Sequence, residues 1–155
     1  MISEREKQAV RRFAEGCNCA QAVLTTYADV LGLTQEQAAM VSVGFGGGMG
    51  RLREHCGAFS AAVMLCGALE GPEGALKEHR PQTYARVQEV HRRFIQRNGT
   101  ISCAELLGRA RGPEAPVPDA RTPEYYKSRP CARIIRSACK IIDEMLEEMQ
   151  QEKTE

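Results

Sequence analysis

Hydrophobic residues recur along most of the chain at the spacing of an amphipathic helix, and no segment alternates between apolar and polar residues as a half-buried strand does. This spacing, with residues that start and end helices, predicts helices at about 3–15, 18–31, 34–43, 57–69, 82–97 and 130–150, and a short one after Ser102. The last helix has the clearest period, given by Ile134, Ile135, Ala138, Ile141, Ile142, Met145, Leu146 and Met149. The pattern therefore predicts an all-α protein.

Two of the predicted helices indicate which faces are buried. The segment 57–69 is apolar on nearly every side, which is typical of a helix enclosed by others. The segment 82–97 carries many arginines on one side and, on the other, Tyr84, Val87, Phe94 and either Val90 or His91. We expect a single-domain bundle of about five to seven helices around the central helix 57–69.

The length of 155 residues suits one domain. We expect that domain to span residues 1–150 and to be followed by a charged tail at 151–155. Prolines cluster within 109–130, which predicts a long proline-rich loop of a kind that is either functional or loosely ordered.

Charge and composition exclude several classes of protein. A net charge of +1 and the absence of Trp give no footprint for nucleic acid or for an anionic membrane surface. No apolar run approaches the roughly 18 residues of a membrane span, and the charged first residues do not resemble a signal peptide. We therefore expect a cytoplasmic protein that binds neither nucleic acid nor membrane and that could form a homo-oligomer.

Seven cysteines are the strongest compositional feature. In a reducing compartment, cysteines more often bind metal or take part in catalysis than form structural disulfides, and the odd number argues against a complete disulfide set. Cys66 and Cys139 lie in apolar helical sequence and are expected in the core. Cys17 stays open, since it could pair with the nearby Cys19 as a strained disulfide or a resolving thiol.

The other four cysteines fall at the start of predicted helices: Cys19, Cys56, Cys103 and Cys131. The predicted caps are Asn18 with Gln21, Ser102 with Glu105, and Ser128 with Pro130. Free N–H groups and the helix dipole stabilise negative charge there, which lowers a thiol pKa. If these helix starts converge, they form a thiolate cluster suited to a soft metal or an iron–sulfur centre. Without a metal, the same four are candidate redox thiols.

A glycine-dense stretch at Gly44–Gly50 breaks the helical pattern. It lacks the last glycine of a dinucleotide-binding loop, where Met49 stands, and the lysine of a P-loop. Two interpretations remain. Either the stretch is a tight connection between helices, or its backbone approaches a cofactor or sulfurs closely, with candidate cofactor-binding residues Gly46, Gly47, Gly48 and Arg51.

Charged neighbours of Cys56 have two interpretations as well. Arg51 and Arg53 could favour its thiolate, or could be ordinary surface arginines. His55 could be a metal ligand or proton donor, or a surface residue. No Ser/His/Asp set or pair of carboxylates suggests hydrolytic catalysis.

The cysteines and glycines together resemble a known family, over residues 10–145. The similar stretches are Cys19-Ala20-Gln21-Ala22-Val23, Gly44–Arg51 and Cys56-Gly57-Ala58, and the later cysteines Cys103 and Cys131 fit as well. The chain resembles the C_GCAxxG_C_C proteins, which are small, helical, thought to be redox-active, and similar to a domain of split-Soret cytochromes. The resemblance implies an iron–sulfur or other metal centre on Cys19, Cys56, Cys103 and Cys131. Ala61 stands where the pattern has glycine, and no Cys-x-x-Cys-His supports covalent haem.

Three functional hypotheses follow. The first is an iron–sulfur or other soft-metal protein for electron transfer or sensing, working with an unidentified redox partner. The second is a metal-free thiol–disulfide protein in which Cys56 pairs with Cys19 or Cys103. The third is a non-redox helical module whose cysteines pack in the core or bind structural zinc.

Overall fold

Helices account for every regular element in the computed structural model, which describes residues 1–154. The longer ones are α1 (Glu4–Ala14), α2 (Cys19–Thr26), α4 (Gln35–Ser42), α6 (Gly57–Ala68), α7 (Arg80–Asn98) and α10 (Cys131–Thr154). The shorter ones are α3 (Ala28–Leu31), α5 (Gly46–Met49), α8 (Cys103–Leu107) and α9 (Pro123–Ser128), with 3-10 turns η1 (Val43–Phe45), η2 (Gly71–Ala75) and η3 (Lys77–His79). The predicted all-α class is confirmed, since the described range contains no strand.

Three boundaries differ from the prediction. The helix expected at 18–31 is interrupted at Tyr27, whose backbone (φ −110°, ψ 19°) leaves the helical region. The proline-rich segment contains α9, because Thr122 caps it and Pro123 fits its first position. The expected charged tail is helical through Thr154 as part of α10, and Glu155 lies outside the described residues.

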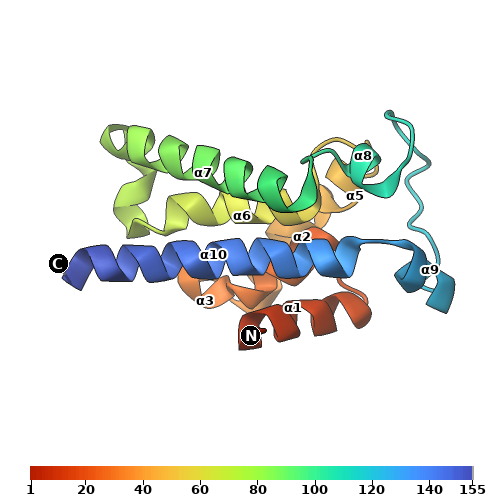
Figure 1. Ribbon diagram of the computed structural model, residues 1–155, viewed down its shortest axis with the longest axis horizontal. Helices are drawn as coiled ribbons and strands as arrows, with labels where there is room; N and C mark the ends of the chain where they lie inside the picture. The colour runs from red at the N-terminus through yellow and green to blue at the C-terminus, as the bar shows by residue number, and fades with distance from the viewer. Residues whose placement is uncertain (155) are drawn as a thin grey trace.

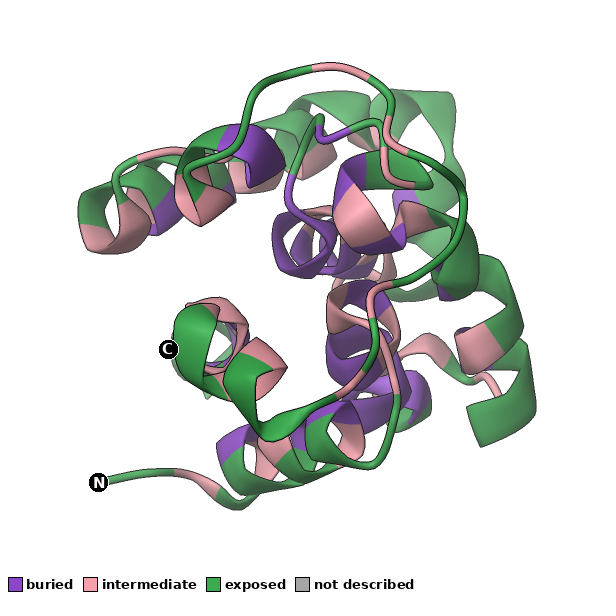
Figure 2. Cartoon of the chain, turned by 90° about the vertical axis from the view of Figure 1, so that its right-hand side faces the viewer, coloured by how far each residue is buried: buried purple, intermediate pink, exposed green. Residues whose placement is uncertain are grey.

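The predicted central helix occupies the middle of the bundle. α6 packs against α2, α7 and α10, while α1 covers the outer side of α10 and α2 (Figure 1). Small side chains on α6 allow this close packing, and Ala61, which stands where the family pattern has glycine, is fully buried. The core therefore forms around α6, with buried positions gathered in the middle of the molecule (Figure 2).

The apolar stripe of α10 faces this core, with only Leu146 half-buried rather than buried. On α7, Val90 and Phe94 are buried as expected, and of the two alternatives Val90 is the inward residue, because His91 is exposed. Tyr84 was wrongly assigned to the buried side. It is 59% exposed, because the first turns of α7 adjoin the short segments η2 and η3 rather than a full helix face.

Buried polar contacts tie the N-terminal half of the chain to α10. The Tyr27 hydroxyl donates to the carbonyl of Cys139 at 2.9 Å and approaches Asp143 Oδ1 at 2.6 Å. Ser3 donates to the other oxygen of Asp143 at 2.9 Å. These contacts fix α1 and α2 against α10, at a distance from the glycine-rich end of the bundle.

No helix among residues 1–154 combines the length and apolar character needed to cross a membrane.

A substitution of Ile135 tests whether the apolar face of α10 is buried in the core. It is fully buried, so Ile135→Ala should leave a cavity and lower the free energy of unfolding by about 2–5 kcal/mol. The adjacent Arg136 is exposed, and Arg136→Ala should change it by no more than about 0.5 kcal/mol. Urea unfolding followed by circular dichroism measures both. Equal, small effects would contradict the burial of this face.

Candidate functional site

The structure brings the four predicted cysteines together. Cys19, Cys56, Cys103 and Cys131 line one cavity of about 30 Å³, with Gly57, Leu106, Leu107 and Ile134 completing its walls. The remaining cysteines lie elsewhere: Cys66 and Cys139 are buried in the core as expected, and Cys17 is half-buried outside this cavity.

Local sequence explains the position of Cys19. Asn18 and Gln21 form the predicted capping box, in which the Gln21 N–H donates to Asn18 Oδ1 at 2.9 Å and the Asn18 N–H donates to Gln21 Oε1 at 3.1 Å. The Asn18 amide also donates to the carbonyl of Val43 at 2.9 Å. The cap therefore fixes the first turn of α2 against the glycine-rich stretch.

The two other predicted caps need correction. Ser102 accepts a hydrogen bond from the Glu105 N–H at 3.3 Å, but the Glu105 carboxylate binds Thr100 and Arg111 instead of returning to Ser102, so the box is half-formed. Ser128 ends α9 and donates to the carbonyl of Tyr125, so it does not cap α10.

Paired backbone segments hold Cys56 beside Cys103. The Cys56 N–H donates to the carbonyl of Ile101 at 2.7 Å, and the Cys103 N–H donates to the carbonyl of Glu54 at 2.6 Å. His55 lies on this crossing through its backbone, while its ring is exposed and packs edge-on against Phe59. His55 is therefore not among the residues that line the thiol cavity.

Glycines let the backbone approach the sulfurs. A Cβ on Gly57 would lie 2.6 Å from Cys19 Sγ, and one on Gly48 would lie 2.5 Å from the Cβ of Cys103. Gly47 and Gly48 also have φ of 69° and 66°, in the left-handed region that favours glycine. Within Gly44–Gly50, Gly48 lies against the side chain of Cys103 and the Gly47 N–H bonds the sulfur of Cys19. The structure therefore favours close approach to the cysteines over a simple connection between helices.

Cys19 is the activated thiol of the four. The Cys56 thiol donates a hydrogen bond to it, and the N–H groups of Gly47, Ala20 and Gly57 also bond its sulfur. Together they outweigh burial and lower the pKa of Cys19 to about 6. The same bond to Cys19, with burial, raises the pKa of Cys56 well above its ordinary value. The opposed shifts favour a thiolate at Cys19 and a protonated thiol at Cys56.

The expectation that all four helix starts favour a thiolate is wrong. Burial raises the pKa of Cys131 to about 11, and the charge of Cys19 adds to this. Burial also raises the pKa of Cys103, although Arg53 opposes it. The free-energy penalty of desolvating a buried thiolate exceeds the stabilisation that a helix N-terminus provides, unless several hydrogen-bond donors converge on the sulfur. Among the four cysteines, they converge only on Cys19.

Neither interpretation of Arg51 and Arg53 fits the structure, because both side chains are largely buried and contact residues other than Cys56. Arg53 is only 2% exposed, with Nη1 at 3.5 Å from Cys103 Sγ and Nη2 at 2.8 Å from Glu114 Oε1. Arg51 donates to Glu114 at 2.9 Å and to Asp119 at 3.4 Å. Both arginines therefore connect the thiol site to the proline-rich segment.

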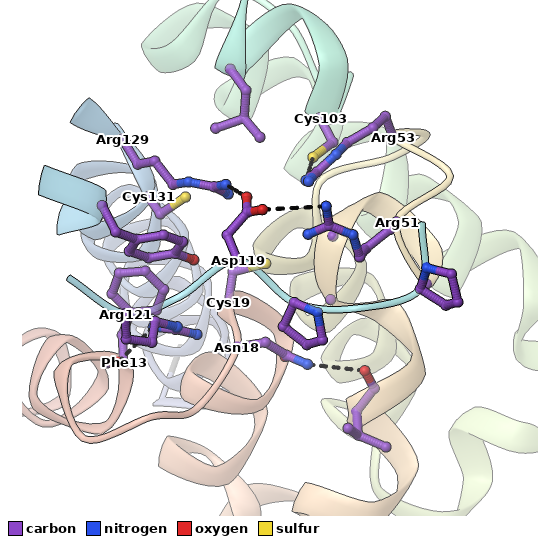
Figure 3. A pocket seen from close by; sticks show the side chains of 18 residues that line it. Phe13, Asn18, Cys19, Arg51, Arg53, Cys103, Asp119, Arg121, Arg129 and Cys131 are labelled. Atoms are coloured by element: carbon purple, nitrogen blue, oxygen red, sulfur yellow. Dashed lines mark hydrogen bonds and ion pairs between the residues drawn. The ribbon is translucent and has the colours of Figure 1, made fainter. Parts of the chain in front are cut away.

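A larger cavity of about 310 Å³ opens in front of the thiols (Figure 3). Its walls include Cys19, Cys103 and Cys131, the glycines Gly46 and Gly47, the arginines Arg51, Arg53, Arg121 and Arg129, and Asp119. Glu114, Asp119, Arg121 and Arg129 belong to this site or contact it, although the sequence pattern did not indicate them as site residues. The unusual length of the proline-rich segment was the only signal that pointed to them.

The thiols share a cavity without forming a ready-made metal site. Four thiolates are the donor set that iron–sulfur clusters and structural zinc take. Across residues 1–154, however, no group of three or more His, Cys, Asp or Glu side chains is arranged to hold a metal ion.

Comparison with known proteins agrees with the cysteine pattern. A family model described as "Putative redox-active protein (C_GCAxxG_C_C)" matches residues 17–145. No curated protein matches the chain, and no solved structure matches it.

Alanine substitutions at two glycines of α6 test whether the first turn of this helix lies against the sulfur of Cys19. Gly57→Ala should push a methyl group onto Cys19 Sγ and Phe45 O, displace the sulfur from its donors, and raise its pKa. A Cβ on Gly67 would have nothing within 4 Å, so Gly67→Ala should leave Cys19 unchanged and favour the helix by up to about 1 kcal/mol. The pH dependence of iodoacetamide labelling at Cys19, located by peptide mass spectrometry, reports both. Identical profiles for the two variants would refute the contact.

Substitutions of Cys56 test whether its thiol lowers the pKa of Cys19. In the native protein the labelling rate of Cys19 should rise as pH increases through about 6, because the thiolate is the nucleophile. Cys56→Ala removes the strongest donor, so the inflection should move to higher pH, whereas Cys56→Ser keeps an O–H donor and should restore part of the shift. Cys66→Ala, the same substitution at a buried cysteine within α6 and outside the thiol cavity, should not move it. An unchanged inflection in Cys56→Ala would show that Cys56 does not activate Cys19.

Proposed function

Since this chain belongs to the C_GCAxxG_C_C family of proteins described as redox-active, we propose that it carries out thiol–disulfide exchange, with Cys19 as the attacking thiolate and Cys56 as its partner. The observation that carries the proposal is that Cys19 and Cys56 line the same small cavity, with the first turn of α6 lying against the sulfur of Cys19. This environment lowers the pKa of Cys19 and raises that of Cys56. Cys19 also lines the larger cavity, so a substrate can reach its sulfur.

The reaction consumes one disulfide and produces another. The Cys19 thiolate attacks one sulfur of a substrate disulfide, forming a mixed disulfide and releasing the first substrate thiolate. Cys56 then gives up its proton to that leaving thiolate and attacks Cys19 Sγ, which releases the second substrate thiolate. The protein is oxidised by two electrons, the substrate disulfide is reduced to two thiols, and the second leaving group takes its proton from solvent.

Cys103 and Cys131 do not compete with Cys19 as nucleophiles in the cavity. Burial raises the pKa of both Cys103 and Cys131, so both stay protonated near neutral pH. A dithiol partner in a reducing compartment, which we take to be the cytoplasm, would return the oxidised Cys19–Cys56 pair to its thiol form.

A second candidate function is a soft-metal or iron–sulfur centre for electron transfer or sensing. It is favoured by one observation, that four thiols from four different helix starts line the same small cavity. Cys19, Cys56, Cys103 and Cys131 would supply the ligands, and the backbone of Gly46–Gly48 would approach the sulfurs. The four sulfurs would have to move to bond one centre, because no such group is preformed in residues 1–154.

One preparation distinguishes the two functions. The protein is purified without oxygen, its iron, zinc and labile sulfide are measured, and its thiols are counted before and after oxidised glutathione. Thiol–disulfide exchange predicts a metal-free protein whose count falls by two and recovers with reductant. Cys66→Ala should behave identically, whereas Cys56→Ser should stop at a mixed disulfide on Cys19.

Cys103→Ser separates the candidates further, since Cys103 is a ligand in the metal centre but is not one of the exchanging pair. Iron with sulfide, or zinc, that is lost in Cys103→Ser would replace the exchange proposal with the metal centre. Loss of two thiols that persists in Cys103→Ser supports exchange.

A further inference from the structure

The cavity in front of Cys19 has a cationic lining. Arg51, Arg53, Arg121 and Arg129 contribute to its walls, and among the residues that line it Asp119 is the only carboxylate. Arg53 is buried, and its Nε has no hydrogen-bond partner among the described residues. A thiolate at the back of the cavity and guanidinium groups around its walls define a site for an anion next to a nucleophile.

A carboxylate from the chain itself already occupies this environment. Asp119 lies on the connection between α8 and α9 and pairs with Arg51 at 3.4 Å, with Arg109 at 3.3 Å, and with Arg129. Figure 3 shows its carboxylate between Arg129 and Arg51. Asp119 keeps a side-chain exposure of 34%, so it sits on the open side of the cavity, where an incoming group could replace it.

The arginines are held in place without Asp119. Arg51 donates from Nε to the carbonyl of Ala115 at 2.7 Å and also pairs with Glu114. The guanidinium of Arg129 lies 4.3 Å from the centroid of the Tyr125 ring. Arg51 and Arg129 therefore have contacts other than Asp119 that would hold their guanidinium groups at the cavity when this carboxylate leaves.

Arg121 has a different role. Its N–H groups go to the carbonyls of Phe13 and Cys17 at 3.1 and 3.0 Å, and its guanidinium packs against Phe13 and Tyr125. These contacts anchor the proline-rich connection to α1. The anion site therefore consists of Arg51 and Arg129, with Arg109 on its outer side.

We infer that the cavity binds a small substrate bearing a carboxylate, that Arg51 and Arg129 take this carboxylate, and that Asp119 holds the same position until the substrate displaces it. A carboxylate is favoured over other anions because a carboxylate is the group that the arginines already pair with, and the planar guanidinium fork matches its geometry. The inference names the substrate class of the proposed function and depends on it only for the reaction at Cys19.

Two alkylating reagents of nearly equal size test the site. Iodoacetate carries a carboxylate and iodoacetamide is neutral, so the ratio of their rates at Cys19 measures attraction of the anion and cancels the reactivity of the sulfur. Asp119→Asn removes the competing charge and should raise the ratio of iodoacetate to iodoacetamide by about fivefold, the factor that a partly exposed ion pair is worth. Arg129→Gln should lower it. Asp29 pairs with Arg5 outside the cavity, so Asp29→Asn should leave the ratio unchanged.

An unchanged ratio in Asp119→Asn would overturn the inference. If both reagents then react faster by the same factor, Asp119 only holds the connection closed. Repeating the measurement in Cys56→Ser separates this inference from the proposed function. That variant cannot form the Cys19–Cys56 disulfide, yet its ratio should still respond to Asp119→Asn. A response there without thiol–disulfide exchange in the native protein would retain the anion site and reject the exchange.

Discussion

The close approach of two helix starts at the sulfur of Cys19 is the constraint on which the rest of the site depends. Gly57 has no side chain, so the first turn of α6 can lie against this sulfur, where a Cβ would fall at 2.6 Å. The N–H groups of Ala20, Gly57 and Gly47 then reach the same atom from three segments. Since α6 also fills the middle of the bundle, the core and the thiol site are positioned by the same helix.

This arrangement makes four similar residues chemically different. All four cysteines line one cavity, but burial raises the pKa of Cys103 and Cys131, whereas the converging donors lower that of Cys19. Sharing a hydrogen bond keeps the proton on Cys56. A nucleophile beside a protonated thiol suits thiol–disulfide exchange, because two buried thiolates side by side would repel each other. Cys56 can lose its proton and attack once Cys19 has entered a mixed disulfide and carries no charge.

The proline-rich connection between α8 and α9 forms one wall of the larger cavity in front of Cys19. Its carboxylates, Glu114 and Asp119, pair with arginines that line the cavity, and Glu114 reaches the buried Arg53 beside Cys103. The segment is therefore tied to the thiols through charge rather than through apolar packing, and it has few buried residues of its own. Of these pairs, the more exposed one at Asp119 is the one that a substrate carboxylate would replace in the proposed site.

The helices, the central position of α6, the cap of Cys19 and the four cysteines of interest could be predicted from the chain alone, because helical periodicity and capping depend on residues only three or four positions apart. Contacts between distant segments could not be predicted in this way. Cys56 meets Cys19 across 37 positions of the chain, Arg53 turns to Cys103 rather than to its neighbour Cys56, and Asp119 reaches Arg51 from a segment without helical period. A thiol pKa depends on burial and on every donor around the sulfur, and these are fixed only when distant segments pack together.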